Sequence, residues 1–310
     1  MSAQRFLIAL LAVVCFTTTV FAAQYTSVVV YGDSLSDNGN LFAATGGTIP
    51  PDPPYYQGRR SNGPVAVEYL AASLGAPLFD FAWIGATTGV GNYGDGGTVT
   101  SVGSSGLLGM TALYDATKGS LGPFISGGLF VVWGGPNDIL APSPLDFTPQ
   151  NIITRAVTNE LAIIAELKGM GVKSILAPGM PDLGLTPYFK SLGQAAAAYG
   201  TAFAGAFNAG LQALLPSDVL YYDTASWMRS VVTDPAAYGL TNVTDAYLLT
   251  GSGEDPNGYL FYDDFHPTTA AHAILAREFE ATVAVPEPAT IILVSAGLGG
   301  LVFWQRRRSA

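Results

Sequence analysis

The middle of this 310-residue chain alternates short runs of β-branched and aromatic residues with longer stretches of helical periodicity. That alternation is typical of a parallel sheet whose strands are joined by helices. The runs that predict strands are 27–31, 78–82, 129–133, 174–177 and 218–222, and the clearest predicted helices are 151–168, 194–215 and 268–283. We therefore expect one α/β domain, a three-layer α/β/α sandwich with a parallel sheet of about five strands.

Two long segments between these elements, 45–64 and 85–109, are rich in glycine or proline. Segments of this length without regular structure are usually functional in a compact domain. We expect them to cover or flank a pocket.

Both ends of the chain have the pattern of sorting segments. Residues 1–23 hold one basic residue, Arg5, followed by an apolar run and small residues, which predicts a secretory signal peptide. An uncleaved membrane anchor is the alternative. Cys15, the only cysteine, lies inside that run, and Val14 before it is bulkier than the residue that usually precedes a lipid-bearing cysteine. Removal of the signal peptide leaves no cysteine, which excludes disulfides and thiolate metal sites in the mature protein.

The other end combines Val-Pro-Glu-Pro at 285–288 with an apolar stretch, 289–304, and three arginines at 306–308. Sixteen residues at ~1.5 Å each give a helix of roughly 24 Å, slightly short of a ~30 Å hydrocarbon core. Residues 285–310 resemble the PEP-CTERM sorting signal. The resemblance implies an exported protein of the cell surface, matrix or medium, with transient membrane attachment through 289–304, cytoplasmic arginines and processing by an exosortase. A permanent tail anchor is the alternative.

Residues 24–284, the expected domain, carry 9 Lys and Arg against 22 Asp and Glu, a net charge of −13. Such a surface repels phosphate backbones and anionic lipids. Nucleic acid is therefore not an expected partner, and a neutral ester or polysaccharide fits better.

Ser34 follows the first predicted strand, in Gly-Asp-Ser-Leu-Ser at 32–36. A serine acts as a nucleophile when a base takes its proton and donors stabilise the oxyanion. A strand-to-helix corner presents the hydroxyl outward, and a helix N-terminus offers unpaired N–H groups to developing negative charge. An N-capping serine is the commoner occupant of such a corner. The G-x-S-x-G pattern of α/β hydrolases does not fit, because Ser36 replaces its last glycine.

The chain has two histidines, and His266 is the better candidate for a base. Asp263 precedes it by three residues, so the carboxylate can accept the imidazole Nδ1–H and direct Nε2 toward a serine. Alternatively, Asp263 is a turn residue before the last helix. We interpret His272 as a packed or half-exposed helix residue. Two histidines cannot build the usual nitrogen-rich zinc site, and Asp263 with Asp264 could bind a cation only incidentally, so we expect no metal or other cofactor.

Four blocks in order, 32–40, 81–86, 135–138 and 263–267, resemble those of the GDSL, or SGNH, hydrolase family. Residues 56–65 and 235–244 resemble its lipase, esterase and hemolysin branch, and the likeness covers most of 27–280. Two residues depart from that branch: Tyr262 stands in place of a frequent tryptophan and Arg60 in place of a common aromatic residue. We expect both to alter the pocket without removing a catalytic group.

The resemblance implies a flavodoxin-like sheet with the site at the C-terminal ends of the strands. It implies Ser34 as nucleophile, His266 as base and Asp263 as the residue that orients the base. The oxyanion donors it implies are the Ser34 N–H, the Gly85 N–H and the Asn137 side chain. From the residues alone, Gly85 would provide loop flexibility and Asn137 a turn amide.

The sequence therefore predicts a signal peptide at 1–23, a hydrolase domain at 24–284 and a sorting segment at 285–310. The expected activity is that of an esterase- or lipase-like serine hydrolase that forms an acyl-enzyme on carboxylic esters. Its substrate would be a small-molecule, lipid or acylated-polysaccharide ester. An acyltransferase, a polysaccharide O-deacetylase using the same residues, and a non-catalytic surface or matrix protein are the alternatives.

Overall fold

The computed structural model of the chain describes residues 25–251 and 253–284. The predicted signal peptide at 1–23 and the predicted sorting segment at 285–310, with its apolar run 289–304, lie outside the described residues. In the described part, the helices are all too short or too polar to cross a membrane.

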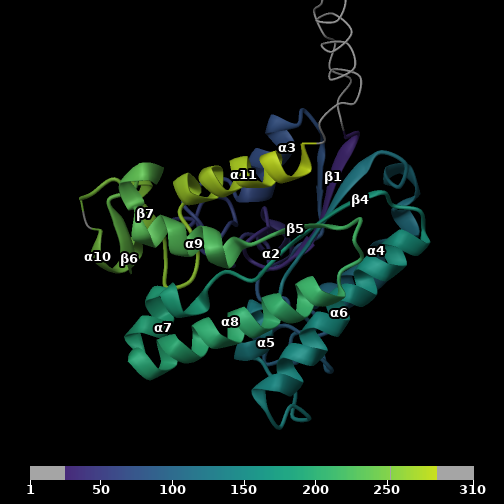
Figure 1. Cartoon of the computed structure of the whole chain (residues 1–310), viewed down its shortest axis with the longest axis horizontal. Helices are drawn as coiled ribbons and strands as arrows, with labels where there is room; N and C mark the ends of the chain where they lie inside the picture. The colour runs from purple at the N-terminus through teal and green to yellow at the C-terminus, as the bar shows by residue number, and fades with distance from the viewer. Residues whose placement is uncertain (1–24, 252, 285–310) are drawn as a thin grey trace, which may run out of the picture.

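Five parallel strands form the central sheet, in the order β2-β1-β3-β4-β5 (Figure 1). This is the flavodoxin-like order, so the predicted fold class is confirmed. The strands are β1 (Ser27–Gly32), β2 (Leu78–Asp80), β3 (Gly128–Trp133), β4 (Ser174–Pro178) and β5 (Leu220–Tyr222).

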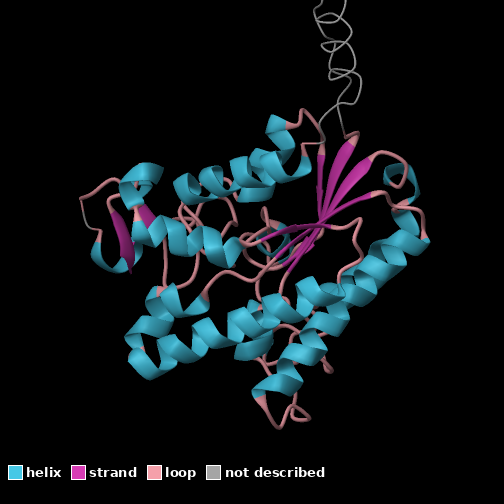
Figure 2. Ribbon diagram, viewed as in Figure 1, coloured by secondary structure: helices cyan, strands magenta, loops and turns pink. Residues whose placement is uncertain are grey.

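Helices cover both faces of the sheet, which explains why β1 and β3 are buried at every position and are mostly apolar. Val28 and Val30 face the layer of α3 (Ala66–Ser73) and α11 (Thr269–Val283). Their neighbours Val29 and Tyr31 face the layer of α4 (Met110–Thr117) and α6 (Pro149–Gly169). Figure 2 shows the strands between these two layers, and α8 (Gln194–Leu214) packs beside α6 in the same layer.

The long helices begin where the sequence places their caps. Thr148 and Thr268 stand immediately before α6 and α11, and their side chains accept hydrogen bonds from the N–H groups of Asn151 and Ala271. Each side chain satisfies one of the unpaired donors of a first helical turn. The predicted helices 151–168, 194–215 and 268–283 are thus confirmed to within two residues.

Two predicted strands are shorter than expected. The regular pairing of the run 78–82 with β1 ends at Asp80, although the N–H groups of Phe81 and Trp83 still donate to the carbonyls of Val30 and Gly32. The run 218–222 pairs with β4 only from Leu220 onward. A separate parallel pair, β6 (Asn242–Ala246) and β7 (Tyr259–Phe261), was not predicted, because β6 is mostly polar. The short helices are α2 (Asn40–Ala44), α5 (Pro136–Leu140), α7 (Pro187–Ser191), α9 (Thr224–Thr233) and α10 (Tyr247–Thr250).

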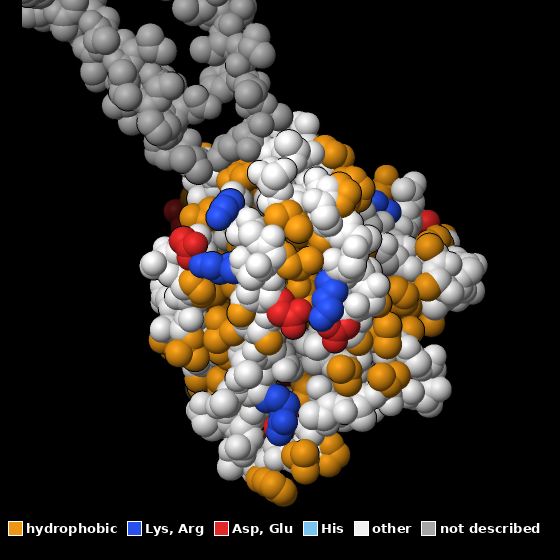
Figure 3. Space-filling view, turned by 90° about the vertical axis from the view of Figure 1, so that its right-hand side faces the viewer, with side chains coloured by type: hydrophobic (Ala, Val, Ile, Leu, Met, Phe, Trp, Pro, Cys, Tyr) orange, Lys and Arg blue, Asp and Glu red, His pale blue; other side chains and the backbone are white. Residues whose placement is uncertain are grey.

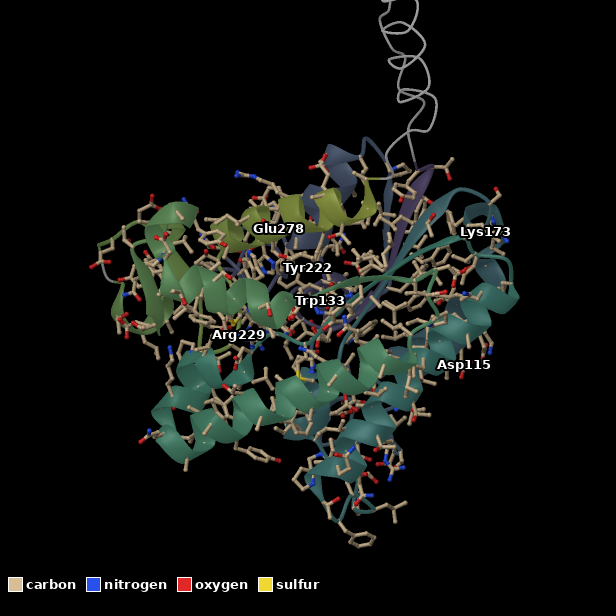
Figure 4. All side chains as sticks on the ribbon, viewed as in Figure 1. Asp115, Trp133, Lys173, Tyr222, Arg229 and Glu278 are labelled. Atoms are coloured by element: carbon tan, nitrogen blue, oxygen red, sulfur yellow. The ribbon has the colours of Figure 1, made fainter. Side chains whose placement is uncertain are left out.

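Aromatic side chains fix α11 over the sheet. The Phe279 ring meets Trp133 and Tyr222 edge-on, each with ring centroids 5.4 Å apart. Trp133 Nε1 also donates to the carbonyl oxygen of Gly179 at 3.0 Å. Figure 4 shows Trp133 and Tyr222 beneath α11. Since both residues end their strands, this packing holds α11, and the loop before it, at the carboxyl edge of the sheet.

The surface is mixed in charge on the face drawn in Figure 3, where basic side chains lie singly or beside acidic ones. Among the described ion pairs, Lys118 contacts Asp115 at 2.7 Å and Glu166 at 3.0 Å. Exposed pairs of this kind add little stability. That face presents no continuous basic area of the kind that binds a polyanion.

Candidate active site

Residues far apart in the sequence meet at the carboxyl edge of the sheet. Ser34 follows β1, Gly85 follows β2, and Asn137 lies in α5 directly after β3. Asp263 and His266 lie between β7 and α11. The chain passes from β1 to β2 on one side and returns to β3 on the other, so the crevice between β1 and β3 is the topological switch point. Open α/β sheets bind their ligands at such a point.

Three of the predicted site residues form one line of hydrogen bonds. His266 Nε2 lies 2.8 Å from Ser34 Oγ. On the other side of the ring, His266 Nδ1 lies 2.7 Å and 2.8 Å from the two carboxylate oxygens of Asp263. The backbone N–H groups of Phe265 and His266 also donate to Asp263 Oδ1. Asp263 is thus held by its own loop and in turn holds the imidazole toward Ser34.

Ser34 lies in a turn, not at the start of a helix. The N–H groups of Ser36 and Asp37 donate to the carbonyl of Asp33, and α2 begins only at Asn40. The helix N-terminus expected at Ser34 is therefore absent from the described structure at that position. Within the described residues the Ser34 N–H has no hydrogen-bond partner, so it is available to a ligand.

Gly85 has a φ of +79°, a conformation that favours glycine. A Cβ at this position would lie 2.4 Å from Oδ1 of Asn92. The Asn92 side chain donates to the carbonyls of Ile84 and Leu108 and so closes the loop 85–109 on itself. The Gly85 N–H, like that of Ser34, has no partner in the part of the chain that the structure describes.

The Asn137 side chain is engaged in the resting structure. Its Nδ2 donates to the carbonyl of Ala86 at 3.0 Å and to Asp33 Oδ2 at 3.3 Å. The bond to Asp33 is at the long end of the hydrogen-bond range.

A pocket of about 300 Å³ opens over these groups. Both long loops contribute to its wall, Tyr55 and Arg60 from 45–64 and Gly85 and Tyr93 from 85–109, so the prediction that they flank a pocket is confirmed. Arg60, one of the two residues that depart from the family pattern, therefore borders the pocket. Most of the remaining wall is apolar: Leu35, Ile84, Leu140, Leu183, Met228 and Phe265.

A family model of GDSL-like lipases and acylhydrolases matches residues 28–279, which include all five predicted site residues. The chain belongs to the GDSL-like lipase/acylhydrolase family. It is accordingly a carboxylic ester hydrolase.

Two relatives of this GDSL hydrolase are named as an acyltransferase and as an esterase/lipase. It is 28% identical to a phosphatidylcholine-sterol acyltransferase of Aeromonas hydrophila, over 88% of this chain and 95% of the relative. It is 25% identical to a GDSL esterase/lipase of Arabidopsis thaliana, over 83% of this chain and 88% of the relative. Among solved structures, the acetylxylan esterase Axe2 of Geobacillus stearothermophilus aligns with a TM-score of 0.46 at 15% identity, over 85% of this chain and 97% of that one.

A second family model, the PEP-CTERM protein-sorting motif, matches residues 284–308. The GDSL hydrolase is therefore an exported protein that is sorted to the cell surface.

The carboxylate of Asp263 is kept ionised by its partners. Burial pushes its pKa upward, but the His266 imidazole and the N–H groups of Phe265 and His266 outweigh burial and hold the pKa well below its usual value. His272 is different, because burial lowers its pKa to about 3 and its Nδ1 accepts the N–H of Ala66. His272 is thus a neutral, packed helix residue.

Three acidic side chains are buried beneath the pocket, Asp33, Asp138 and Glu160, which we call the buried carboxyl cluster. Burial raises the pKa of Asp33 to about 6 and that of Asp138 to about 7, and it raises that of Glu160 well above its usual value. The nearby charge of Asp33 raises the pKa of Asp138 further. No basic side chain pairs with the cluster among the described residues.

The described residues contain no group of three or more His, Cys, Asp or Glu side chains arranged to hold a metal ion.

The sequence did not single out two polar groups of the site. Asp33 stands beside Ser34 in the motif, but its burial could not be read from the sequence. Tyr55, whose hydroxyl contacts Asp263, lies in a long loop that has no periodicity to place it.

From the raised pKa values of the buried carboxyl cluster, we expect stability to fall as the pH rises. A carboxyl whose pKa is raised on folding binds its proton more tightly in the folded state, so the stability it contributes is full below the unfolded pKa of about 4 and is lost as the pH passes the folded value. For Asp138, with a folded pKa of about 7, the loss is about 3 kcal/mol between about pH 5 and pH 8. We expect Asp138→Asn to remove most of that loss, as measured by urea denaturation at both pH values.

Asp234→Asn is the matched control, because it changes an exposed carboxyl that caps a short turn. Its unfolding free energy should follow the wild-type pH dependence. An Asp138→Asn variant whose stability still declined as steeply as that of the wild type would contradict the prediction.

Proposed function

We propose that this exported hydrolase cleaves carboxylic esters through an acyl-enzyme on Ser34, with His266 as the base and Asp263 as the residue that orients it. The observation that carries the proposal is the hydrogen-bond line from Asp263 through His266 to Ser34, with 2.8 Å between Nε2 and Oγ. This is the distance that proton transfer between a nucleophile and its base requires.

The proposed reaction uses these groups twice. His266 Nε2 takes the proton of Ser34 as Oγ attacks the ester carbonyl, and the imidazolium returns that proton to the leaving alcohol. Water then gives one proton to the same nitrogen as its oxygen attacks the acyl carbon. The imidazolium returns that proton to Oγ as the acyl–Oγ bond breaks, which releases the carboxylic acid and restores the Ser34 hydroxyl. Asp263 stabilises the imidazolium formed in each half, which is consistent with a carboxyl whose pKa stays low.

The proposed oxyanion hole combines two free donors and one engaged donor. The N–H groups of Ser34 and Gly85 have no partners in the described structure and border the pocket. The Asn137 amide would join them by exchanging its 3.3 Å bond to Asp33 for the substrate oxygen, while keeping its bond to Ala86. Donors directed at a developing charge in a water-poor pocket stabilise the transition state strongly.

The substrate we propose is an extracellular ester of a small molecule, a lipid or an acylated polysaccharide. The apolar wall of the pocket supports binding of an acyl group, and sorting to the cell surface supports an extracellular substrate. We further propose a removable signal peptide at 1–23, a catalytic domain at 24–284, and a segment at 285–310 that holds the protein at the membrane through 289–304 until an exosortase processes it.

Ser34→Ala should lower the hydrolysis of p-nitrophenyl butyrate by about 10⁴-fold or more, because no acyl-enzyme can form. The rate of p-nitrophenol release measures this directly. Ser36→Ala is the matched control: it removes a buried hydroxyl of the same turn that has no partner in the described structure, and it should retain activity. A Ser34→Ala protein as active as the control would refute the assignment.

Asn137→Ala should lower kcat by about 10²- to 10³-fold, or roughly 3 kcal/mol of transition-state stabilisation, with a smaller effect on KM. The reason is that an oxyanion donor acts mainly when charge develops on the substrate oxygen. Steady-state kinetics on p-nitrophenyl butyrate separate the two constants. An unchanged kcat would remove Asn137 from the proposed oxyanion hole.

Acyl transfer is the second candidate, favoured by the relative named as a phosphatidylcholine-sterol acyltransferase and by an apolar pocket in which an alcohol can compete with water. In the presence of a long-chain alcohol, the protein should then form a new ester from p-nitrophenyl butyrate, detected by mass spectrometry. Free butyrate as the sole product over a range of alcohol concentrations would leave hydrolysis alone.

A further inference from the structure

A tyrosine from the first long loop completes the hydrogen bonding of the candidate triad. The hydroxyl of Tyr55 donates to Asp263 Oδ2 at 2.7 Å, across 208 positions of the sequence. The backbone N–H groups of Phe265 and His266 both donate to the other oxygen, Oδ1. Among the described residues, Asp263 Oδ2 therefore has two partners, the His266 imidazole and the Tyr55 hydroxyl.

The position of Tyr55 is fixed from several sides. Its side chain is only 9% exposed, and its ring meets Tyr262 edge-on with centroids 5.7 Å apart. The Tyr262 hydroxyl in turn donates to the carbonyl of Pro54 at 2.5 Å. Both contacts attach the loop 45–64 to the segment that carries Asp263 and His266. The hydroxyl is therefore presented to Asp263 by packed structure.

The charges around Tyr55 favour its role as a donor. Burial and the adjacent Asp263 carboxylate raise the pKa of Tyr55, so the phenol keeps its proton. The Arg60 guanidinium lies 4.9 Å from the ring centroid. A cation in this place makes the phenol a stronger hydrogen-bond donor, and Arg60 has no ion pair with any described carboxylate.

We propose that Tyr55 is a positioning residue of the hydrolytic centre: its hydroxyl fixes the carboxylate of Asp263 so that His266 presents Nε2 to Ser34. The proposal rests on the function proposed above. Without the hydroxyl, Asp263 Oδ2 keeps only the imidazole as a partner, so the carboxylate is held through Oδ1 alone and positions His266 less firmly. A displacement of about 1 Å in such an arrangement typically costs about 10²-fold in rate.

The hydroxyl also sets how strongly Asp263 holds a protonated imidazole. A donor on Oδ2 withdraws negative charge from the carboxylate, so its removal lets Asp263 stabilise imidazolium more strongly. The base then stays protonated, and inactive, up to a higher pH. The other charged groups near this carboxylate and its histidine are Asp33, Asp264 and Arg60, and the substitution of Tyr55 leaves them in place.

Tyr55→Phe tests the proposal, because it removes the hydroxyl and keeps the ring between Tyr262 and Arg60. We expect kcat for p-nitrophenyl butyrate to fall by about 10- to 100-fold with KM nearly unchanged. The acidic limb of the kcat/KM profile should move to higher pH. Labelling of Ser34 by a fluorophosphonate probe should slow by a factor similar to that for kcat.

Two control variants separate positioning from a general loosening of the loop. Tyr56→Phe changes the exposed neighbour, whose hydroxyl has no partner in the described structure, and it should behave as wild type. Tyr262→Phe releases the bond to Pro54 but leaves the hydroxyl of Tyr55 on Asp263, so the acidic limb should stay in place. The same kcat loss and the same displacement of the limb in Tyr262→Phe would overturn the proposal.

A Tyr55→Phe protein with wild-type kcat and pH profile would also overturn it, while an inactive Ser34→Ala protein would still support the proposed function. If Tyr55→Phe does not fold, as judged by thermal unfolding, Arg60→Gln serves instead. It removes the cation over the ring and should move the acidic limb in the same direction by a smaller amount. An unchanged limb in Arg60→Gln would then count against the role of Tyr55.

Discussion

The hydrogen bond between His266 Nε2 and Ser34 Oγ is the constraint on which the rest of the structure depends, because it joins groups 232 positions apart. Ser34 is placed by β1, which lies inside the sheet with β2 and β3 on either side. His266 is placed by α11, which packs on α3 and, through Phe279, on Trp133 and Tyr222. A contact of 2.8 Å therefore requires the whole stack of sheet and helix to be correct. A small displacement of α11 relative to the sheet would change the distance between Nε2 and Oγ, on which the proposed proton transfer depends.

Buried carboxylates order the loops at the carboxyl edge of the sheet, as aromatic packing orders α11. Asp33 accepts the N–H of Leu35 after β1, Asp138 accepts that of Thr88 in the loop after β2, and Glu160 accepts that of Gly134 after β3. Where a chain leaves a parallel sheet its backbone donors lose their ladder partners, and a carboxylate is a strong acceptor that can replace them. The cost is desolvated charge, which the cluster lowers by binding protons. The loops that carry the site are thus ordered by acceptors that are themselves costly to bury.

The fold and most of the candidate site could be predicted from the sequence, because their signals are local. Apolar runs mark β1, β3 and β4, threonine caps mark α6 and α11, and Asp263 lies one turn before His266. What could not be predicted depends on distant contacts. The hydroxyl of Tyr55 reaches Asp263 from an irregular loop, and β6 forms only because β7 lies beside it. The second hydrogen bond of Asn137, to Asp33, joins α5 to the turn after β1, and nothing in the sequence indicates it.

The candidate site and the two ends of the described domain lie at opposite edges of the sheet. Tyr25 precedes β1, and its hydroxyl donates to the carbonyl of Val283 at the end of α11, so both ends of the domain meet at the amino edge of the sheet. Ser34, Asp263 and His266 lie at the carboxyl edge, and α11 alone spans 15 residues, or roughly 22 Å, between the His266 loop and Val283. The match to the PEP-CTERM motif begins at residue 284, directly after this point. Residue 284, the first residue of that match, thus lies at the edge of the sheet opposite the pocket.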